Sequence, residues 1–428
     1  MEPGEKKIPK PTPFEVNKIE DENNIEKNEI KNEIEDEKEI KNEIKDEIND
    51  DIIDDKEDFQ IDAKELEFND QPEIKIEKEE DLQNIVKDSE KIEIDNINDA
   101  LNVQAVLEKL KKTAFTKLEL LSINNLAIDS LEFLNNECFK SLIVLEIKNS
   151  KITTLDKLNE APLAELKVLD LSSNGINSIE SLIQCPFKNL EILNLAENKN
   201  IKDVNPIAKA GFKSLRKLDL SSNQIDNINY LGDVSLSNLE SLYLNDNQLV
   251  DISVLSGSTF KKLKDLQLSN NKINNIDIFR EADRFKELEE LQLCGNEIDS
   301  IEALSKSPLE KLKMLKLSKN KIIDIEALKN PSFKNLEQLD LFDNQIKNID
   351  EVFNGTSFNE NIKELDLSYN CLESIDVLVD KQNFPKLQDL NIEGNSNLDY
   401  TNKNKDKNIS KLFDNYGINY TFNPIIKK

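Results

Sequence analysis

LKVLDLSSNGI, at residues 166–176, is the stretch of sequence that decides the fold. Nine later copies follow along the chain, among them LRKLDLSSNQI, LKDLQLSNNKI, LKMLKLSKNKI and IKELDLSYNCL. Each closes on an asparagine, and successive asparagines lie 24 to 26 residues apart. Two earlier copies, LELLSINNLAI and LIVLEIKNSKI, keep the apolar frame but have Leu126 and Ser150 in place of the asparagine. Twelve copies of one period predict a solenoid, in which each repeat packs mainly on its neighbours.

Each position of the repeat has a distinct structural role. With Leu166 as position 1, the leucines at positions 1, 4 and 6 predict the buried face of a short strand, and positions 3, 5 and 7 its outer face. After the asparagine, an apolar residue recurs every third position (Ile176, Ile179, Leu182), which suits a 3-10 or helical turn. The asparagine amide can donate and accept, so it can satisfy backbone groups where the strand turns away. We predict this structural ladder for Asn174, Asn198, Asn223, Asn247, Asn271, Asn296, Asn320, Asn344, Asn370 and Asn395.

The pattern resembles the leucine-rich repeat family over about residues 118–398. Its IxxIxxL second half is similar to the repeat class of the leucine-rich regulatory subunit of protein phosphatase 1 and of bacterial internalins, whose repeats are shorter. The resemblance implies an α/β solenoid that is curved, with a parallel concave sheet and a convex side of 3-10 or helical turns. It implies little about function, because one fold can host many unrelated sites.

The chain divides by composition into four parts. Residues 1–94 predict an acidic, low-complexity arm that is mostly disordered, because aromatic residues are few and Glu, Asp, Lys and Asn abound. Isoleucines between residues 29 and 53 fall on one side of a charged helix. This helix either frays alone or docks, as in a coiled coil, on a partner or on the chain's own solenoid. Residues 95–117 predict an N-terminal helical cap, 118–400 about twelve repeats, and 401–428 a C-terminal cap and tail.

Charge and cysteine usage restrict the partner and the compartment. The net charge is −29, so repulsion by nucleic acid and anionic lipid argues against those partners. We expect another protein with a basic or amphipathic surface, while the oligomeric state is left open. The N-terminus has no apolar leader segment, and no long apolar run occurs. The four cysteines lack CxxC spacing, so we expect a cytoplasmic protein, with the nucleus as the other option.

No set of residues predicts catalysis. The chain has no histidine, which removes histidine-based acid–base work, nucleophile pairs and metal ligands. Its nine glycines form neither a GxGxxG nor a P-loop string, and calcium loops of the DxDxDG type are absent. We therefore expect no enzymatic activity, no cofactor and no metal.

The concave sheet is then the candidate binding surface. Leu120, Val144, Val168 and Ile192 occupy position 3 of four consecutive repeats and predict an apolar strip, which Glu146 and Asp170 border. Such a strip suits a basic amphipathic partner, although β-branched residues are also tolerated on open strands. Large side chains near the same face are of the type enriched at binding hot spots. The predicted protein-binding residues are Val144, Glu146, Val168, Asp170, Ile192, Asp219, Tyr243, Met314, Phe342 and Tyr369.

These features predict a non-catalytic protein-binding scaffold or adaptor that uses its concave face. Three alternatives stay open. The repeat class suggests a regulatory subunit of a protein phosphatase. The acidity is similar to that of acidic leucine-rich nuclear phosphoproteins, which suggests a binder of basic nuclear proteins, although here the acidic arm precedes the repeats. An extracellular adhesion protein is the third alternative, against which the missing leader argues.

Overall fold

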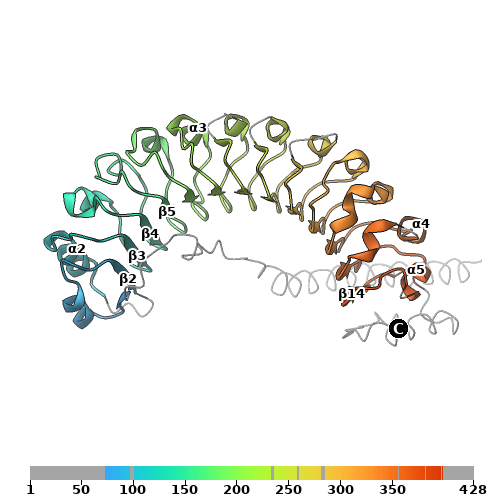
Figure 1. Cartoon of the computed structure of the whole chain (residues 1–428), viewed down its shortest axis with the longest axis horizontal. Helices are drawn as coiled ribbons and strands as arrows, with labels where there is room; N and C mark the ends of the chain where they lie inside the picture. The colour runs from blue at the N-terminus through green and yellow to red at the C-terminus, as the bar shows by residue number, and fades with distance from the viewer. Residues whose placement is uncertain are drawn as a thin grey trace, which may run out of the picture. The chain divides into compact units, whose positions relative to one another are not determined.

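A computed structural model describes residues 73–96, 101–232, 236–257, 260–280, 285–354, 356–380, 382–396 and 398. Over these residues, fourteen parallel strands form one open sheet in which every strand pairs with the next along the chain. Figure 1 shows the strands on the inner side of an arc, with the short helices and turns on its outer side. The predicted helix between residues 29 and 53 and the predicted cap at 401–428 lie outside the described residues.

The strands of the later repeats occupy positions 3 to 5 of the motif, as the alternation of apolar residues predicts. The first and the last ten strands have three residues each, and the second to fourth have five. The strands are β1 (Ile74–Ile76), β2 (Lys91–Asp95), β3 (Leu120–Asn124), β4 (Val144–Lys148), β5 (Val168–Asp170), β6 (Ile192–Asn194), β7 (Lys217–Asp219), β8 (Ser241–Tyr243), β9 (Asp265–Gln267), β10 (Glu290–Gln292), β11 (Met314–Lys316), β12 (Gln338–Asp340), β13 (Glu364–Asp366) and β14 (Asp389–Asn391).

The convex side consists mainly of single 3-10 turns that follow the three-residue rhythm of isoleucine and leucine. In one repeat the turn begins directly after Ile179 and buries Leu182, which is the predicted arrangement. The turns include η4 (Glu180–Gln184), η7 (Ser253–Ser256), η9 (Asp277–Phe279), η11 (Glu302–Lys306) and η12 (Glu326–Lys329). Within the described ranges, the α-helices are α2 (Val103–Lys112), α3 (Asn205–Ala210), α4 (Asp350–Phe353) and α5 (Asp376–Val379).

One continuous apolar core lies between the sheet and the convex turns. Leu166, Leu169 and Leu171 are fully buried, so positions 1, 4 and 6 point inward. A second layer of large side chains stacks from repeat to repeat beneath the convex turns; Phe187 and Phe212, for example, have ring centroids 6.0 Å apart. Because each repeat covers the core of the next, the rigid sheet can hold side chains at fixed places on its concave face.

The ordered fold begins earlier than predicted, so the arm boundary at residue 94 is wrong. Strand β2 crosses that boundary and pairs with β3 over five residue pairs. Ile92 and Ile94 are fully buried and alternate with half-buried neighbours, which is the pattern of a strand. The sequence KIEID of this strand lacks the leucines of the repeat motif and resembles the isoleucine-rich acidic sequence before it, so it did not indicate a repeat. Helix α2 lies between β2 and β3, so it is the convex part of an early coil rather than a cap in front of the sheet.

A left-handed backbone conformation recurs at position 8, directly before the position that the asparagine occupies in ten of the twelve repeats. All twelve repeats have a positive φ there, and only two of the residues are glycines. Side chains with a Cβ destabilise this conformation, although Asn and Asp tolerate it better than most. The residues are Asn125, Asn149, Ser173, Glu197, Ser222, Asp246, Asn270, Gly295, Lys319, Asp343, Tyr369 and Gly394. The left-handed residue turns the chain out of each strand.

Candidate protein-binding surface

Positions 3 and 5 form two continuous rows across the concave face. Neighbouring strands pair in register, so Val168 lies beside Val144 on one side and beside Ile192 on the other. The same register places Asp340 of β12 beside Asp366 of β13. A property shared by consecutive repeats therefore becomes a stripe on the surface.

Three of the four residues of the apolar strip are closed to solvent and Leu120 is half-buried, so the prediction that the strip forms an exposed patch is wrong. Val144, Val168 and Ile192 are only 2%, 0% and 5% exposed, yet they do not belong to the core beneath the sheet. Side chains converge on the concave side of a curved sheet, so bulky residues on strands about 4.8 Å apart help to cover one another. Met314, at position 3 of β11, is by contrast only half-buried.

The Asp and Asn side chains at position 5 accept backbone hydrogen bonds at the ends of the strands. The Asp219 carboxylate accepts the backbone N–H of Ser221 at 2.8 Å, and the Asn194 side chain accepts that of Ala196 at 3.0 Å. This bond to the residue two positions on is an Asx turn. Asp170, Asp340, Asp366 and Asn391 make the same bond. Two of the predicted binding residues, Asp170 and Asp219, thus take part in the architecture.

Burial raises the pKa of several of these carboxyl groups. It raises the pKa of Asp219 to about 6, against the hydrogen bond from Ser221, and nearby Asp170 adds to the rise. Burial likewise raises the pKa of Asp366 to about 6, with a contribution from Asp340. The pKa of Asp170 is also raised, chiefly by burial. The ionised forms therefore destabilise the folded state near neutral pH.

Phe342 and Tyr369 come together after β12 and β13, at the edge where the strands end. Their ring centroids are 5.4 Å apart in an edge-to-face arrangement. The Lys319 ammonium lies 6.0 Å from the centroid of the Phe342 ring. A Cβ on Gly394 would approach Tyr369 Cγ to 2.8 Å, so the glycine leaves room for that ring.

The remaining predicted binding residues lie on separate strands. Tyr243, on β8, is half-buried, and burial together with Asp265 raises the pKa of its phenol. The thioether of Met314 lies 3.9 Å from the side-chain amide nitrogen of Gln292. Glu146 accepts the hydroxyl of Ser122 at 2.7 Å. Of the predicted large side chains, the structure pairs Phe342 with Tyr369.

The asparagine ladder connects each repeat with the one before it. Asn247 Nδ2 donates to the carbonyl oxygens of Leu220, Leu244 and Asn245 at 3.0 to 3.2 Å. Its Oδ1 accepts the backbone N–H of Ile225, in the preceding repeat, at 3.0 Å. Eight further asparagines of the ladder repeat both halves of this pattern: Asn174, Asn198, Asn271, Asn296, Asn320, Asn344, Asn370 and Asn395.

Asn223 departs from this pattern because its buried Oδ1 has no hydrogen-bond partner. The preceding repeat has one extra residue between Asn198 and its first isoleucine, Ile201. The N–H of Ile201 bonds instead to the backbone carbonyl of Asn198 at 2.9 Å. Because of this single inserted residue, Asn223 donates the hydrogen bonds of the ladder but does not accept one.

A ladder of alternating charge runs along position 2, at the edge where the strands begin. This alternation was not predicted, although it is present in the sequence at position 2 of successive repeats. Arg216 and Lys264 both contact Glu240, at 3.1 and 2.8 Å, and Lys313 contacts Glu289 at 2.6 Å. The full series is Lys167, Glu191, Arg216, Glu240, Lys264, Glu289, Lys313, Glu337 and Lys363.

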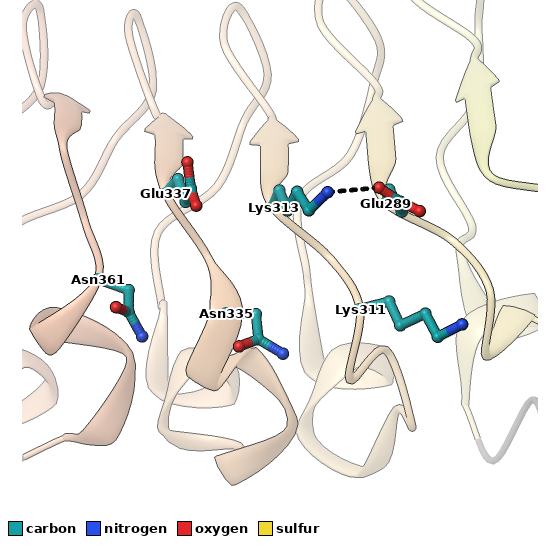
Figure 2. Close-up of a pocket in the computed structure, with 6 residues that line it drawn as sticks. All are labelled: Glu289, Lys311, Lys313, Asn335, Glu337 and Asn361. Atoms are coloured by element: carbon teal, nitrogen blue, oxygen red, sulfur yellow. Dashed lines mark hydrogen bonds and ion pairs between the residues drawn. The ribbon is translucent and has the colours of Figure 1, made fainter.

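A cavity of about 370 Å³ lies beside this ladder. It is lined by Glu289, Lys311, Lys313, Asn335, Glu337 and Asn361. Figure 2 shows Lys313 extended toward Glu289, with Asn335, Lys311 and Asn361 in the links below the strands. Its two acids and two lysines balance, so the cavity favours neither an anion nor a cation.

The described residues contain no group of three or more His, Cys, Asp or Glu placed to hold a metal ion. Within the same ranges, no helix is long and apolar enough to cross a membrane. Cys138, Cys185, Cys294 and Cys371 form no disulfide.

Comparison with known proteins gives consistent results at the level of sequence and of structure. Family models described as leucine rich repeat match residues 164–225, 286–346 and 358–377, and one described as leucine rich repeats in two copies matches 213–257. No curated protein sequence matches significantly.

Two bacterial structures illustrate the similarity of fold. An internalin from Listeria monocytogenes is 25% identical with a TM-score of 0.59, over 76% of this chain and 89% of that one. A leucine-rich repeat protein from Leptospira interrogans is 23% identical with a TM-score of 0.59, over 78% of this chain and 84% of that one.

Proposed function

Since the chain is a leucine-rich repeat protein, a family whose solenoids are typically non-enzymatic binding scaffolds, we propose that it binds another protein through its concave face. The observation that carries this proposal is a difference between the two ends of that face. Position 3 is closed at Val144 and Val168, whereas Glu364 of β13 and Asp389 of β14 are exposed. We therefore propose that the partner binds at the β13–β14 end, where position 3 is exposed.

The charge of this end supports a basic partner. Glu364, Asp366 and Asp389 lie on two neighbouring strands, and Asp340 lies on the strand before them. Complementary charge increases the rate of association and selects among partners more than it adds affinity. We therefore propose a partner whose contacting surface is basic, which is the acidic-binder form of the scaffold function.

The phosphatase, nuclear and adhesion alternatives rest on resemblance and composition, and no contact among the described residues singles out one of them. We propose a cytoplasmic location. The four cysteines without disulfides support it, because unpaired thiols suit a reducing compartment. Fractionation of cells that produce the chain would test it, and recovery in the medium would contradict it.

Affinity capture with the full chain tests the binding surface. The test variant carries Glu364→Lys and Asp389→Lys, and the matched control carries Glu180→Lys and Glu302→Lys on the convex turns. All four residues are exposed, so neither pair of changes should disturb the core. We expect the same partner with the wild type and the convex variant, and its loss with the concave variant. Equal capture by all three proteins would contradict the use of this face.

A further inference from the structure

One asparagine of the ladder is followed by a glycine. The sequence at this place is Asn174–Gly175, whereas the other nine ladder asparagines precede a residue with a side chain. The sequence holds one further Asn–Gly pair, in which Asn354 is the exposed residue directly after α4. A glycine after asparagine has a chemical consequence, because without a Cβ its backbone nitrogen can reach the asparagine side chain with little steric hindrance.

The backbone does not require a glycine at residue 175. Gly175 is not among the residues with a positive φ. A Cβ at this position would lie 3.4 Å from the Thr153 methyl carbon and 3.5 Å from the Ile152 carbonyl oxygen, which are ordinary contact distances. Gln224 and Gln248 take the equivalent place in two later repeats. Gly175 therefore makes its neighbour reactive without serving the conformation of the turn.

Asn174 is also the least protected member of the ladder. It is half-buried, whereas the other nine ladder asparagines are buried. It is the first asparagine of the series, because Ser150 occupies that position in the preceding repeat. The Ile147 carbonyl oxygen therefore receives one ladder amide, from Asn174 at 2.8 Å. The Leu171 carbonyl oxygen receives two, from Asn174 and Asn198 at 3.0 Å each.

Hydrogen bonds engage both groups that would react. Nδ2 of Asn174 donates to three backbone carbonyl oxygens at 2.8 to 3.1 Å, and Oδ1 accepts the N–H of Ile152 at 3.1 Å. The N–H of Gly175 donates to the Ile152 carbonyl oxygen at 2.9 Å. Attack of the Gly175 nitrogen on the Asn174 side chain requires these bonds to break, so it requires local opening of the repeat.

We propose that Asn174 is a site of spontaneous deamidation, which the folded array suppresses and local opening permits. The backbone nitrogen of Gly175 attacks Cγ of Asn174, and the new C–N bond closes a cyclic succinimide. The bond from Cγ to Nδ2 breaks, and Nδ2 leaves as ammonia with the proton of the attacking nitrogen. Water then opens the ring at either carbonyl group and gives aspartate or isoaspartate. Water is the co-reactant, and no group is oxidised or reduced.

The product cannot restore the hydrogen bonds of Asn174. An ionised carboxylate accepts hydrogen bonds but donates none, so the Ile147 carbonyl oxygen loses its ladder donor and faces a negative charge. Isoaspartate also adds an atom to the backbone where the chain turns away from β5. A chain that has opened once at this place therefore stays weakened between β4 and β5. This inference goes beyond the proposed function and is independent of the partner.

Peptide mapping by mass spectrometry follows the reaction in the full chain. The protein is incubated in native buffer and in guanidinium chloride, and deamidation is measured at Asn174 and Asn354. We expect Asn174 to react at least roughly tenfold more slowly in the folded chain, because its reaction needs local opening. In denaturant its rate should approach that of Asn354. Equal rates at Asn174 with and without denaturant would overturn the protection, and an unreactive Asn174 in denaturant would overturn the site.

Gly175→Gln is the matched variant, because the later repeats carry glutamine at this place. It should unfold at the wild-type urea concentration and lose the Asn174 deamidation signal in denaturant, while Asn354 still reacts. Deamidation of Asn174 at the wild-type rate in this variant would show that Gly175 is not the reacting neighbour.

Asn174→Asp imitates the aspartate product. We expect it to lower the folding equilibrium constant roughly tenfold in urea unfolding, as the loss of a buried hydrogen bond implies. Asn354→Asp adds the same charge at an exposed residue and should leave the unfolding midpoint unchanged. A midpoint of Asn174→Asp equal to that of the wild type would overturn the weakening, and so would an equal loss in the Asn354→Asp control.

Discussion

Leucine substitutions at Asn247 and at Asn223, two residues of the asparagine ladder, should have clearly different effects on the free energy of unfolding. In Asn247→Leu, the carbonyls of Leu220 and Leu244 keep amide donors from Asn223 and Asn271, at 2.9 Å each. The Asn245 carbonyl keeps the N–H of Ser222, also at 2.9 Å. The group left without a partner is the buried N–H of Ile225. An unsatisfied buried donor costs about 1–3 kcal/mol, which sets the expected destabilisation.

Asn223→Leu should be much less harmful, because the Asn223 Oδ1 accepts no hydrogen bond in the folded chain. Its three acceptor carbonyls also keep other donors: Leu195 retains Asn198, Leu220 retains Asn247, and Ser221 retains the N–H of Glu197. No buried N–H loses its partner. We expect a change in the free energy of unfolding well below that of Asn247→Leu, with the difference between the variants on the order of 1–3 kcal/mol.

The measurements are urea unfolding of both variants and hydrogen exchange of the Ile225 amide. Exchange at that amide should accelerate in Asn247→Leu and stay slow in Asn223→Leu, since exchange reports local opening. Equal destabilisation by the two changes would refute the reasoning, because it would mean that the ladder acts through packing of the asparagine side chain.

Three further predictions concern the pH response, the backbone and the edge charges. Because the pKa of Asp219 is raised to about 6 in the folded chain, ionisation of this carboxyl destabilises the fold as the pH rises from about 4 through 6. Asp219→Asn should therefore stabilise the fold by up to about 3 kcal/mol above that pH range and leave its stability unchanged below it. Urea unfolding at several pH values measures this difference. Gly295→Ala should lower stability by about 1–2 kcal/mol, since φ is +61° and the new Cβ would approach Asn270 Oδ1 to 2.2 Å; an unchanged melting temperature would contradict this. Glu240→Gln should lose at most about 1 kcal/mol at low salt, because the bridges to Arg216 and Lys264 are partly exposed, and the loss should fade in 1 M salt as screening increases.

The fold was predictable where one apolar period repeats without interruption. Leu169 and Leu171 identify the strand and its buried face, and Ile179 and Leu182 identify the convex turn, because burial in a solenoid depends mainly on the adjacent repeats. The start of the fold was not predictable in this way. Ile92 and Ile94 alternate with polar residues, as expected of a strand. The preceding residues have the same composition of isoleucine, glutamate and lysine, so the alternation could not be distinguished from that background.

The candidate site was less predictable than its scaffold. Position in the motif correctly placed Val168 and Asp170 in the two rows of the concave face, but it could not show that both are almost completely buried. Accessibility depends on the curvature of the sheet and the size of neighbouring side chains, which no single repeat encodes. The contact between Phe342 and Tyr369 joins positions 7 and 8 of consecutive repeats, so reading one position at a time does not reveal it.

Because the charges at position 2 alternate, the array responds differently to the removal of an odd and of an even number of repeats. Removing the one repeat that carries Glu240 would bring Arg216 next to Lys264, with like charges in contact at the seam. Removing that repeat together with the one that carries Lys264 would bring Arg216 next to Glu289, with opposite charges at the seam. The array should therefore shorten or lengthen with least disturbance by an even number of repeats, so its smallest interchangeable module is a pair.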